Sequence, residues 1–164
     1  MKPLTAVVIL ISPLVTACVN DALAPQPGPL QLEAAIARST LGIGDTASIV
    51  FRLRNLTSDS IVLNFNDSCQ ILPYITTRHA DQVVHPSGGD WGCYQVVMSL
   101  TLAPEAAETL TVLVRGGALA TGPGGLRQDR HPAIPLLPGE YLAFARLEHP
   151  DFLLRSPMLA IRVQ

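Results

Sequence analysis

Alternating apolar and polar residues predict β-strands along most of the chain after residue 29. The clearest segment is 47–54, where every second residue from Ala47 to Leu53 is apolar. A repeat of two residues places alternate side chains on opposite faces of a strand, so we expect this segment to bury one face. The same reading predicts further strands at 30–36, 61–65, 71–77, 83–84, 95–102, 109–115, 141–147 and 158–163.

Turn residues separate these strands. Clusters of Gly, Asn, Asp or Pro stand at 42–45, 55–59 and 103–107, and 149–157 is expected to be a loop. Pro73 predicts an edge strand or a bulge, because proline cannot donate a ladder hydrogen bond. No capped amphipathic helix is expected. The pattern predicts an all-β fold, an immunoglobulin-like antiparallel β-sandwich of seven to nine strands.

Residues 116–138 differ from the rest and are expected to form one long loop. They contain four prolines and five glycines, together with Arg127, Arg130 and His131. A loop of this length inside a compact domain is usually functional or disordered. Arg127, Arg130 and His131 are therefore candidate interaction residues, and a loose insertion without function is the alternative.

The first 17 residues resemble a bacterial lipoprotein signal. The apolar run from position 3 to position 14 is too short to span a bilayer as a helix and has the proportions of a signal peptide. The ending Val15-Thr16-Ala17-Cys18 is similar to a lipobox, which implies cleavage before Cys18 and lipid on its sulfur and amino group. An ordinary signal peptide cut elsewhere is the alternative.

Composition after residue 17 is consistent with a displayed domain. Residues 18–29 are proline-rich and are expected to form an extended tether of about 3.1 Å per residue. Residues 30–164 have the length of one domain. The one lysine, Lys2, lies in the signal segment, so residues 18–164 carry ten arginines against 13 acidic residues. This balance disfavours nucleic acid as a partner, and the regularly spaced arginines of the strands, Arg146 among them, are expected to face solvent rather than form a binding patch.

Cys69 and Cys93 form an even pair once Cys18 is assigned to lipid. Disulfides persist in exported proteins, so we expect these two cysteines to be bonded. The closed loop of about 25 residues would contribute roughly 3.5 kcal/mol by the chain-entropy estimate. A metal site or a catalytic thiol is the alternative, and Trp91 is expected to pack near the bridge.

Several segments together resemble the family of the intracellular proteinase inhibitor BsuPI. They are the strand 51–55 (FRLRN), the turn 57–59 (TSD), the strand 61–65 (IVLNF), and the turns at 102–105 (LAPE) and 137–141 (LPGEY). The resemblance covers about residues 41–163 and implies a small immunoglobulin-like β-sandwich. Ala106 stands near the place where the first of these last two turns would favour glycine. No inhibitory residue can be carried over from the family.

Catalytic motifs are not evident, and no enzyme activity and no cofactor are expected. The four histidines, at 79, 85, 131 and 149, are expected in turns or loops. His79 and His85 could approach each other across a hairpin, with Met98 as a soft third ligand, which gives a remote hypothesis of weak copper binding. No metal site is otherwise expected.

The sequence therefore predicts a location more directly than an activity. We expect a lipid-anchored module in the cell envelope, facing the periplasm or exterior, that binds or scaffolds a protein partner. The partner could be recruited through loops or through an edge strand, and β-augmentation at the edge that carries Pro73 is one physical route. The alternative is a protease inhibitor that presents Arg127 or Arg130 on loop 116–138.

Overall fold

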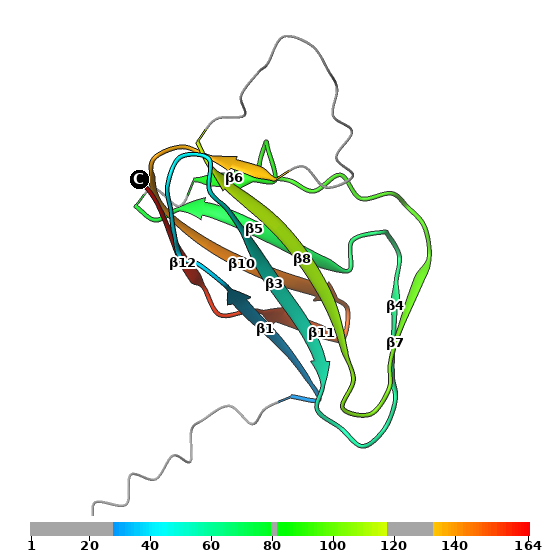
Figure 1. Ribbon diagram of the computed structural model, residues 1–164. Coiled ribbons are helices and arrows are strands. Elements are labelled where there is room, and N and C mark those ends of the chain that lie inside the picture. The colour runs from blue at the N-terminus through cyan, green and yellow to red at the C-terminus, as the bar shows by residue number, and fades with distance from the viewer. Residues whose placement is uncertain (1–27, 80–81, 118–132) are drawn as a thin grey trace, which may run out of the picture.

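The computed structural model describes residues 28–79, 82–117 and 133–164. These residues form two larger β-sheets packed face to face and a separate two-stranded sheet (Figure 1). No helix occurs among them. In particular, none of the described residues belongs to a helix that is long and apolar enough to cross a membrane. The predicted all-β, immunoglobulin-like sandwich is confirmed.

The first sheet has the order β1-β3-β8-β9. Its strands are β1 (Leu30–Ile36), β3 (Thr46–Asn55), β8 (Ala107–Gly116) and β9 (Ile134–Leu136). β3 pairs antiparallel with both β1 and β8, whereas β9 runs parallel to the end of β8.

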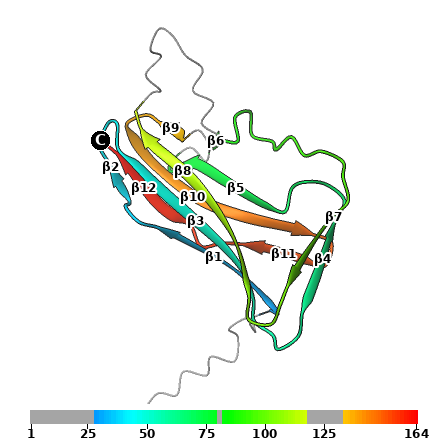
Figure 2. The same ribbon diagram turned by 45° about the vertical axis from the view of Figure 1, so that its right-hand side comes forward.

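The second sheet has the order β2-β12-β10-β5-β6, and β11 pairs with the far end of β10. Its strands are β2 (Thr40–Leu41), β5 (Ile71–Thr77), β6 (Val83–His85), β10 (Gly139–His149), β11 (Phe152–Arg155) and β12 (Leu159–Val163). A separate pair, β4 (Ile61–Phe65) and β7 (Met98–Leu102), runs side by side at one end of the sandwich (Figure 2).

Three short strands raise the number above the predicted seven to nine, to twelve in the described part of the chain. β2 has two residues, and β9 contains Pro135, so neither carries a readable alternation. β11 lies in the segment 149–157 that was expected to be a loop, and that prediction is wrong. Pro150 and Asp151 form a two-residue connection, because His149 pairs directly with Phe152.

Two other predicted boundaries also change. The expected loop 116–138 contains β9, which gains ladder bonds from the edge of β8. The expected strand 95–102 begins only at Met98, where pairing with Phe65 of β4 starts.

Pro73 lies opposite Ala145 of β10, on a part of β5 to which β6 is not paired. The register between β5 and β6 shifts at Ile75. β5 lies between β10 and β6 and is not an edge strand, and the irregularity lies at Ile75 and Thr76 rather than at Pro73, so the prediction for Pro73 holds only in part.

The core lies between the inward faces of the two sheets. Every second residue of β3 from Ala47 to Asn55 is buried, as the alternation predicted. The second sheet contributes the inward residues of β10, such as Ala143 and Leu147, and β4 closes one end of the core with Leu63 and Phe65. The alternate side chains of both sheets point away from this core.

Asn55 joins two turns at the end of β3. Its side chain is 0% exposed, and its Nδ2 donates to the carbonyl oxygens of Asp59, Leu102 and Ala103 at 2.7, 3.1 and 3.1 Å. Its Oδ1 accepts from the N–H and the hydroxyl of Thr57 at 2.9 and 2.8 Å. One buried amide thus fixes the turn after β3 against the turn between β7 and β8.

Tyr141 forms a second fixed corner. Its hydroxyl donates to the carbonyl oxygen of Leu137, four residues earlier, at 2.8 Å. A tyrosine that returns to its own backbone in this way is typical of immunoglobulin-like sandwiches. Burial raises the pKa of Tyr141, which favours the protonated hydroxyl that donates this bond.

Candidate binding site

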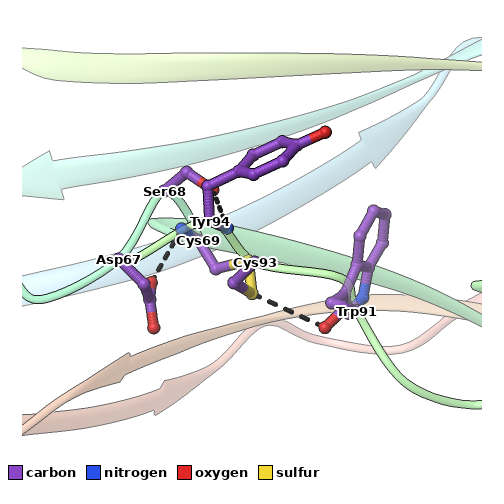
Figure 3. Close-up of a disulfide and its surroundings, with 6 residues drawn as sticks. All are labelled: Asp67, Ser68, Cys69, Trp91, Cys93 and Tyr94. Carbon is purple, nitrogen blue, oxygen red and sulfur yellow. Dashed lines mark hydrogen bonds between the residues drawn. A yellow bond between two sulfur atoms is a disulfide. The ribbon is translucent and has the colours of Figure 1, made fainter. Parts of the chain in front are cut away.

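The disulfide between Cys69 and Cys93 is present, and the prediction for this pair is confirmed (Figure 3). It ties the segment after β4 to the segment before β7, with the two Cα atoms 5.6 Å apart. Beside it, Ser68 N–H donates to the carbonyl oxygen of Tyr94 and Tyr94 N–H donates to Ser68 Oγ, both at 3.0 Å. Among the described residues, Asp67, Cys69 and Cys93 are the only close group of three potential metal ligands, but both sulfurs are bonded to each other.

Trp91 packs mainly away from the disulfide. Its ring lies edge-on to Tyr74, with centroids 6.4 Å apart, and edge-on to His85, with centroids 5.1 Å apart. Only its carbonyl oxygen approaches Cys93 Sγ, at 3.7 Å. The indole therefore fixes the loop before Cys93 onto the outer face of the second sheet, and burial lowers the pKa of His85 beneath it.

Aromatic rings and arginines gather on this outer face. Tyr74 of β5 and Phe144 of β10 are cross-strand partners whose rings stack at 5.4 Å and 15°. The guanidinium of Arg155 lies 4.0 Å from the centroid of Phe144, and Arg146 lies 5.1 Å from that of Tyr74. Phe144 is only 4% exposed although it points away from the core. These contacts are favourable cation–π geometries.

Arg146 and Arg155 lie directly opposite each other in the β10–β11 pair. Both side chains are on the outer face and exposed to solvent. Like charges at directly opposed positions destabilise a sheet, by a few tenths to about 1 kcal/mol. The nearest acid is Glu148, whose Oε1 is 3.7 Å from Arg146, and no acid of the described residues lies within 4 Å of Arg155.

These side chains line a hollow of about 560 Å³, which we call the outer recess. Its walls combine β5, β6, β10, β11, the loop before Trp91 and the segment between β11 and β12. Burial, followed by the charge of Glu148, raises the pKa of Tyr74, and Arg146 opposes that rise. The lining residues are Tyr74, Thr76, Val83, Gly89, Asp90, Leu142, Phe144, Arg146, Arg155 and Met158. A second hollow of about 280 Å³ adjoins it, sharing Arg146 and Arg155 and adding the 82% exposed Leu153.

The other predicted site residues either do not line the outer recess or lie outside the described residues. Cys18, Arg127, Arg130 and His131 lie outside the described residues, so the predictions made for them remain predictions. His79 approaches Glu140, at 3.7 Å, whereas His85 packs on Trp91 and Met98 pairs with Phe65 in the β4–β7 ribbon. The structure thus gives these three candidate copper ligands different neighbours.

His149 corrects the expectation that the histidines lie in turns or loops. It ends β10, is buried, and packs edge-on to Phe65 with centroids 5.3 Å apart. Its Nδ1 accepts the N–H of Asp151 at 3.2 Å. His85 likewise belongs to a strand, β6.

The outer recess itself was not predicted, and Arg146 was assigned to the solvent face without a binding role. The outward direction of Arg146 is correct. The sequence alone does not show the strand register. That register places Arg155 opposite Arg146 and Tyr74 beside Phe144. The one available signal was Phe144, an aromatic residue at an outward position of a strand whose inward positions were already apolar.

Comparisons with known proteins give similarities in shape alone. The sequence matches no protein-family profile and no curated protein. Among solved structures, a CARDB domain from Pyrococcus furiosus is 13% identical, with 82% of this chain and 94% of that chain covered and a TM-score of 0.46.

Two further solved structures are similar at somewhat lower TM-scores. The sporulation control protein Spo0M from Bacillus subtilis is 9% identical, with 84% of this chain and 50% of that chain covered and a TM-score of 0.44. A β-glucosidase from Erythrobacter marinus is 13% identical, and 82% of this chain corresponds to 15% of that chain, with a TM-score of 0.42. At these TM-scores the similarities do not say what this chain does.

Proposed function

We propose that this chain is a non-catalytic binding module that is anchored in the cell envelope by lipid on Cys18 and engages a protein partner through the outer recess. The observation that carries this proposal is the direct opposition of Arg146 and Arg155 on an aromatic base. The arrangement places two positive charges where they disfavour the folded sheet. Such an arrangement is typical of a surface that serves recognition rather than stability.

The anchor rests on the sequence. The apolar run and Cys18 support lipidation, and a lipidated amino terminus with more than one acyl chain would hold the domain stably at a membrane. The proline-rich residues that follow would separate the domain from that surface. The domain would then face the periplasm or the exterior, where the Cys69–Cys93 bond is stable.

The resemblance to the BsuPI family is retained as a proposal about architecture. Two of the residues that carry the resemblance stabilise the fold: Asn55 joins two turns, and Tyr141 forms a corner with Leu137. These roles support a shared sandwich and say nothing of protease inhibition. Inhibition through Arg127 or Arg130 therefore stays a prediction from the sequence.

The proposal is tested by in-cell crosslinking of the wild-type chain and a Cys18→Ala chain, followed by membrane fractionation and identification of crosslinked proteins. We expect the wild type in the membrane fraction with one specific envelope protein attached. We expect the Cys18→Ala chain to leave the membrane fraction. Retention of that variant on membranes would contradict the anchor, and the lack of any specific partner would contradict the binding role.

A further inference from the structure

We infer that the outer recess recognises a peptide segment in which a carboxylate side chain stands next to an apolar residue, with the carboxylate held between Arg146 and Arg155. This inference rests on the proposed binding function and names the chemistry of the partner.

Arg146 and Arg155 have hydrogen-bond donors that no group of the described residues occupies. The only side-chain hydrogen bond of Arg155 among the described residues runs from its Nη2 to Met158 Sδ, at 3.3 Å. Among the same residues, the side chain of Arg146 forms no hydrogen bond, and its nearest acidic partner is Glu148, at 3.7 Å. A planar guanidinium can bind a carboxylate through two parallel N–H···O bonds, and stacking on Phe144 and Tyr74 orients both groups. A carboxylate between them would also remove their mutual repulsion.

The lining beside the arginines includes apolar side chains. Leu142 and Met158 line the outer recess, and the exposed Leu153 lies in the adjoining hollow. A side chain of Leu or Met size next to the carboxylate would cover this surface, and burial of apolar area is favourable. A peptide segment can supply both groups, a carboxylate and an apolar side chain, from neighbouring residues.

Other anionic ligands fit less well. A sugar chain would need an exposed ring face, but Phe144 is stacked by Tyr74 and covered by Arg155. Nucleic acid or an anionic membrane surface presents many negative charges at once. Asp90 in the lining and Glu148 beside Arg146 would repel such a polyanion while leaving room for a single carboxylate.

The fluorescence of Trp91 can report peptide binding to the outer recess. Trp91 is the only tryptophan of the chain, and it packs on Tyr74 at the edge of the recess. The probe is a displayed library of acetylated, amidated heptapeptides, selected against the full chain in detergent micelles. The affinities of the enriched peptides are then measured by Trp91 fluorescence, for the wild type and for Arg146→Gln/Arg155→Gln. The matched control is Arg52→Gln/Arg54→Gln, which removes two exposed arginines from β3 of the other sheet.

We expect the enriched peptides to share an Asp or Glu beside an apolar residue. Loss of one charge-assisted contact should weaken binding about tenfold, so the double variant should lose at least that factor. The Arg52→Gln/Arg54→Gln chain should bind as the wild type does, and exchange of the peptide's Asp or Glu for its amide should match the loss in the Arg146→Gln/Arg155→Gln chain.

Three outcomes would overturn the inference: enrichment of no peptide, enriched peptides without an acidic residue, or equal binding by the two double variants. If such an outcome came together with a specific envelope partner crosslinked in cells, the binding function would stand and only the assigned chemistry would fail. If neither a peptide nor a partner were found, both would fail.

Discussion

Arg146 of β10 lies directly opposite Arg155 of β11, with both guanidinium groups on the outer face of the second sheet. Elsewhere the sheets place opposite charges at such positions. Glu33 is the partner of Arg52 in the β1–β3 pair, and Glu140 is the partner of Arg162 in the β10–β12 pair. The two opposed arginines are therefore an exception to the pattern that stabilises this protein, and they lie in its outer recess.

The first prediction is that Arg146→Gln leaves the free energy of unfolding unchanged or raises it by up to about 0.5 kcal/mol. The substitution removes a repulsive cross-strand pair, and it gives up the loose approach to Glu148 and the cation–π contact with Tyr74, each worth no more than about 1 kcal/mol at an exposed site. Urea denaturation of the two chains measures the difference. A loss of more than about 1 kcal/mol would show that Arg146 serves the fold, which would remove the main reason for assigning it to recognition.

The second prediction concerns Asn55. Asn55→Ala should lower the free energy of unfolding by about 3 kcal/mol or more, because three carbonyl oxygens and the Thr57 N–H lose their partner and one buried side chain leaves a void. Asn64→Ala is the matched control, since Asn64 is exposed on β4 and should change stability by less than about 0.5 kcal/mol. Equal effects of the two substitutions in thermal unfolding would contradict the role of Asn55.

The third prediction concerns Gly116 at the end of β8. A Cβ atom there would clash with the carbonyl oxygen of Gly42, so Gly116→Ala should cost about 2–3 kcal/mol. Gly92→Ala is the control, because a Cβ at Gly92 meets no atom of the described residues within 4 Å. Denaturant midpoints of the two variants give the comparison, and a tolerated Gly116→Ala would mean that the turn before β3 can move aside.

The fourth prediction is a pH effect at Glu140. A hydrogen bond from Arg162, at 2.7 Å, and the charges of Arg162 and Arg78 hold the pKa of this carboxyl below its ordinary value, against a smaller opposing effect of burial. A carboxyl whose pKa is lower in the folded state stabilises the fold above its unfolded pKa, and this contribution is lost as the pH falls through the folded pKa. NMR titration should therefore show Glu140 protonating at lower pH than a free glutamate.

Arg162→Gln provides the check on that cause. In this variant the pKa of Glu140 should rise toward its ordinary value, because the first of its two arginine partners is gone. An unchanged pKa in the Arg162→Gln chain would show that another group lowers it.

Much of the fold could be predicted from the sequence because burial follows the alternation. Residues 47–54 bury the expected face, and Tyr141 follows the turn residues that mark its corner. The short strands β2, β9 and β11 escaped prediction because two to four residues rarely show a period. The glycine position in the turn after β7 was placed near Ala106, but the left-handed residue is Glu105, with φ of 57°.

The outer recess could not be predicted because it depends on register. Arg146 is nine residues before Arg155 in the sequence, and only the two-residue turn at Pro150 and Asp151 sets them opposite each other. Tyr74 reaches Phe144 through the pairing of β5 with β10, which lie about 70 residues apart in the sequence, and loop-closure energetics do not fix such a pairing in advance. Pairings of this kind become visible only in three dimensions.

The central claim is that the outer recess contacts the partner, and site-specific photocrosslinking in cells tests it most directly. A photoreactive residue at Leu153, which is 82% exposed beside Arg146 and Arg155, is compared with one at Ile43, which is 66% exposed in the turn between β2 and β3. We expect a specific envelope protein to crosslink from Leu153, to be lost in the Arg146→Gln/Arg155→Gln chain, and not to crosslink from Ile43. A partner captured from Ile43 but not from Leu153, or one unaffected by loss of both arginines, would contradict the account.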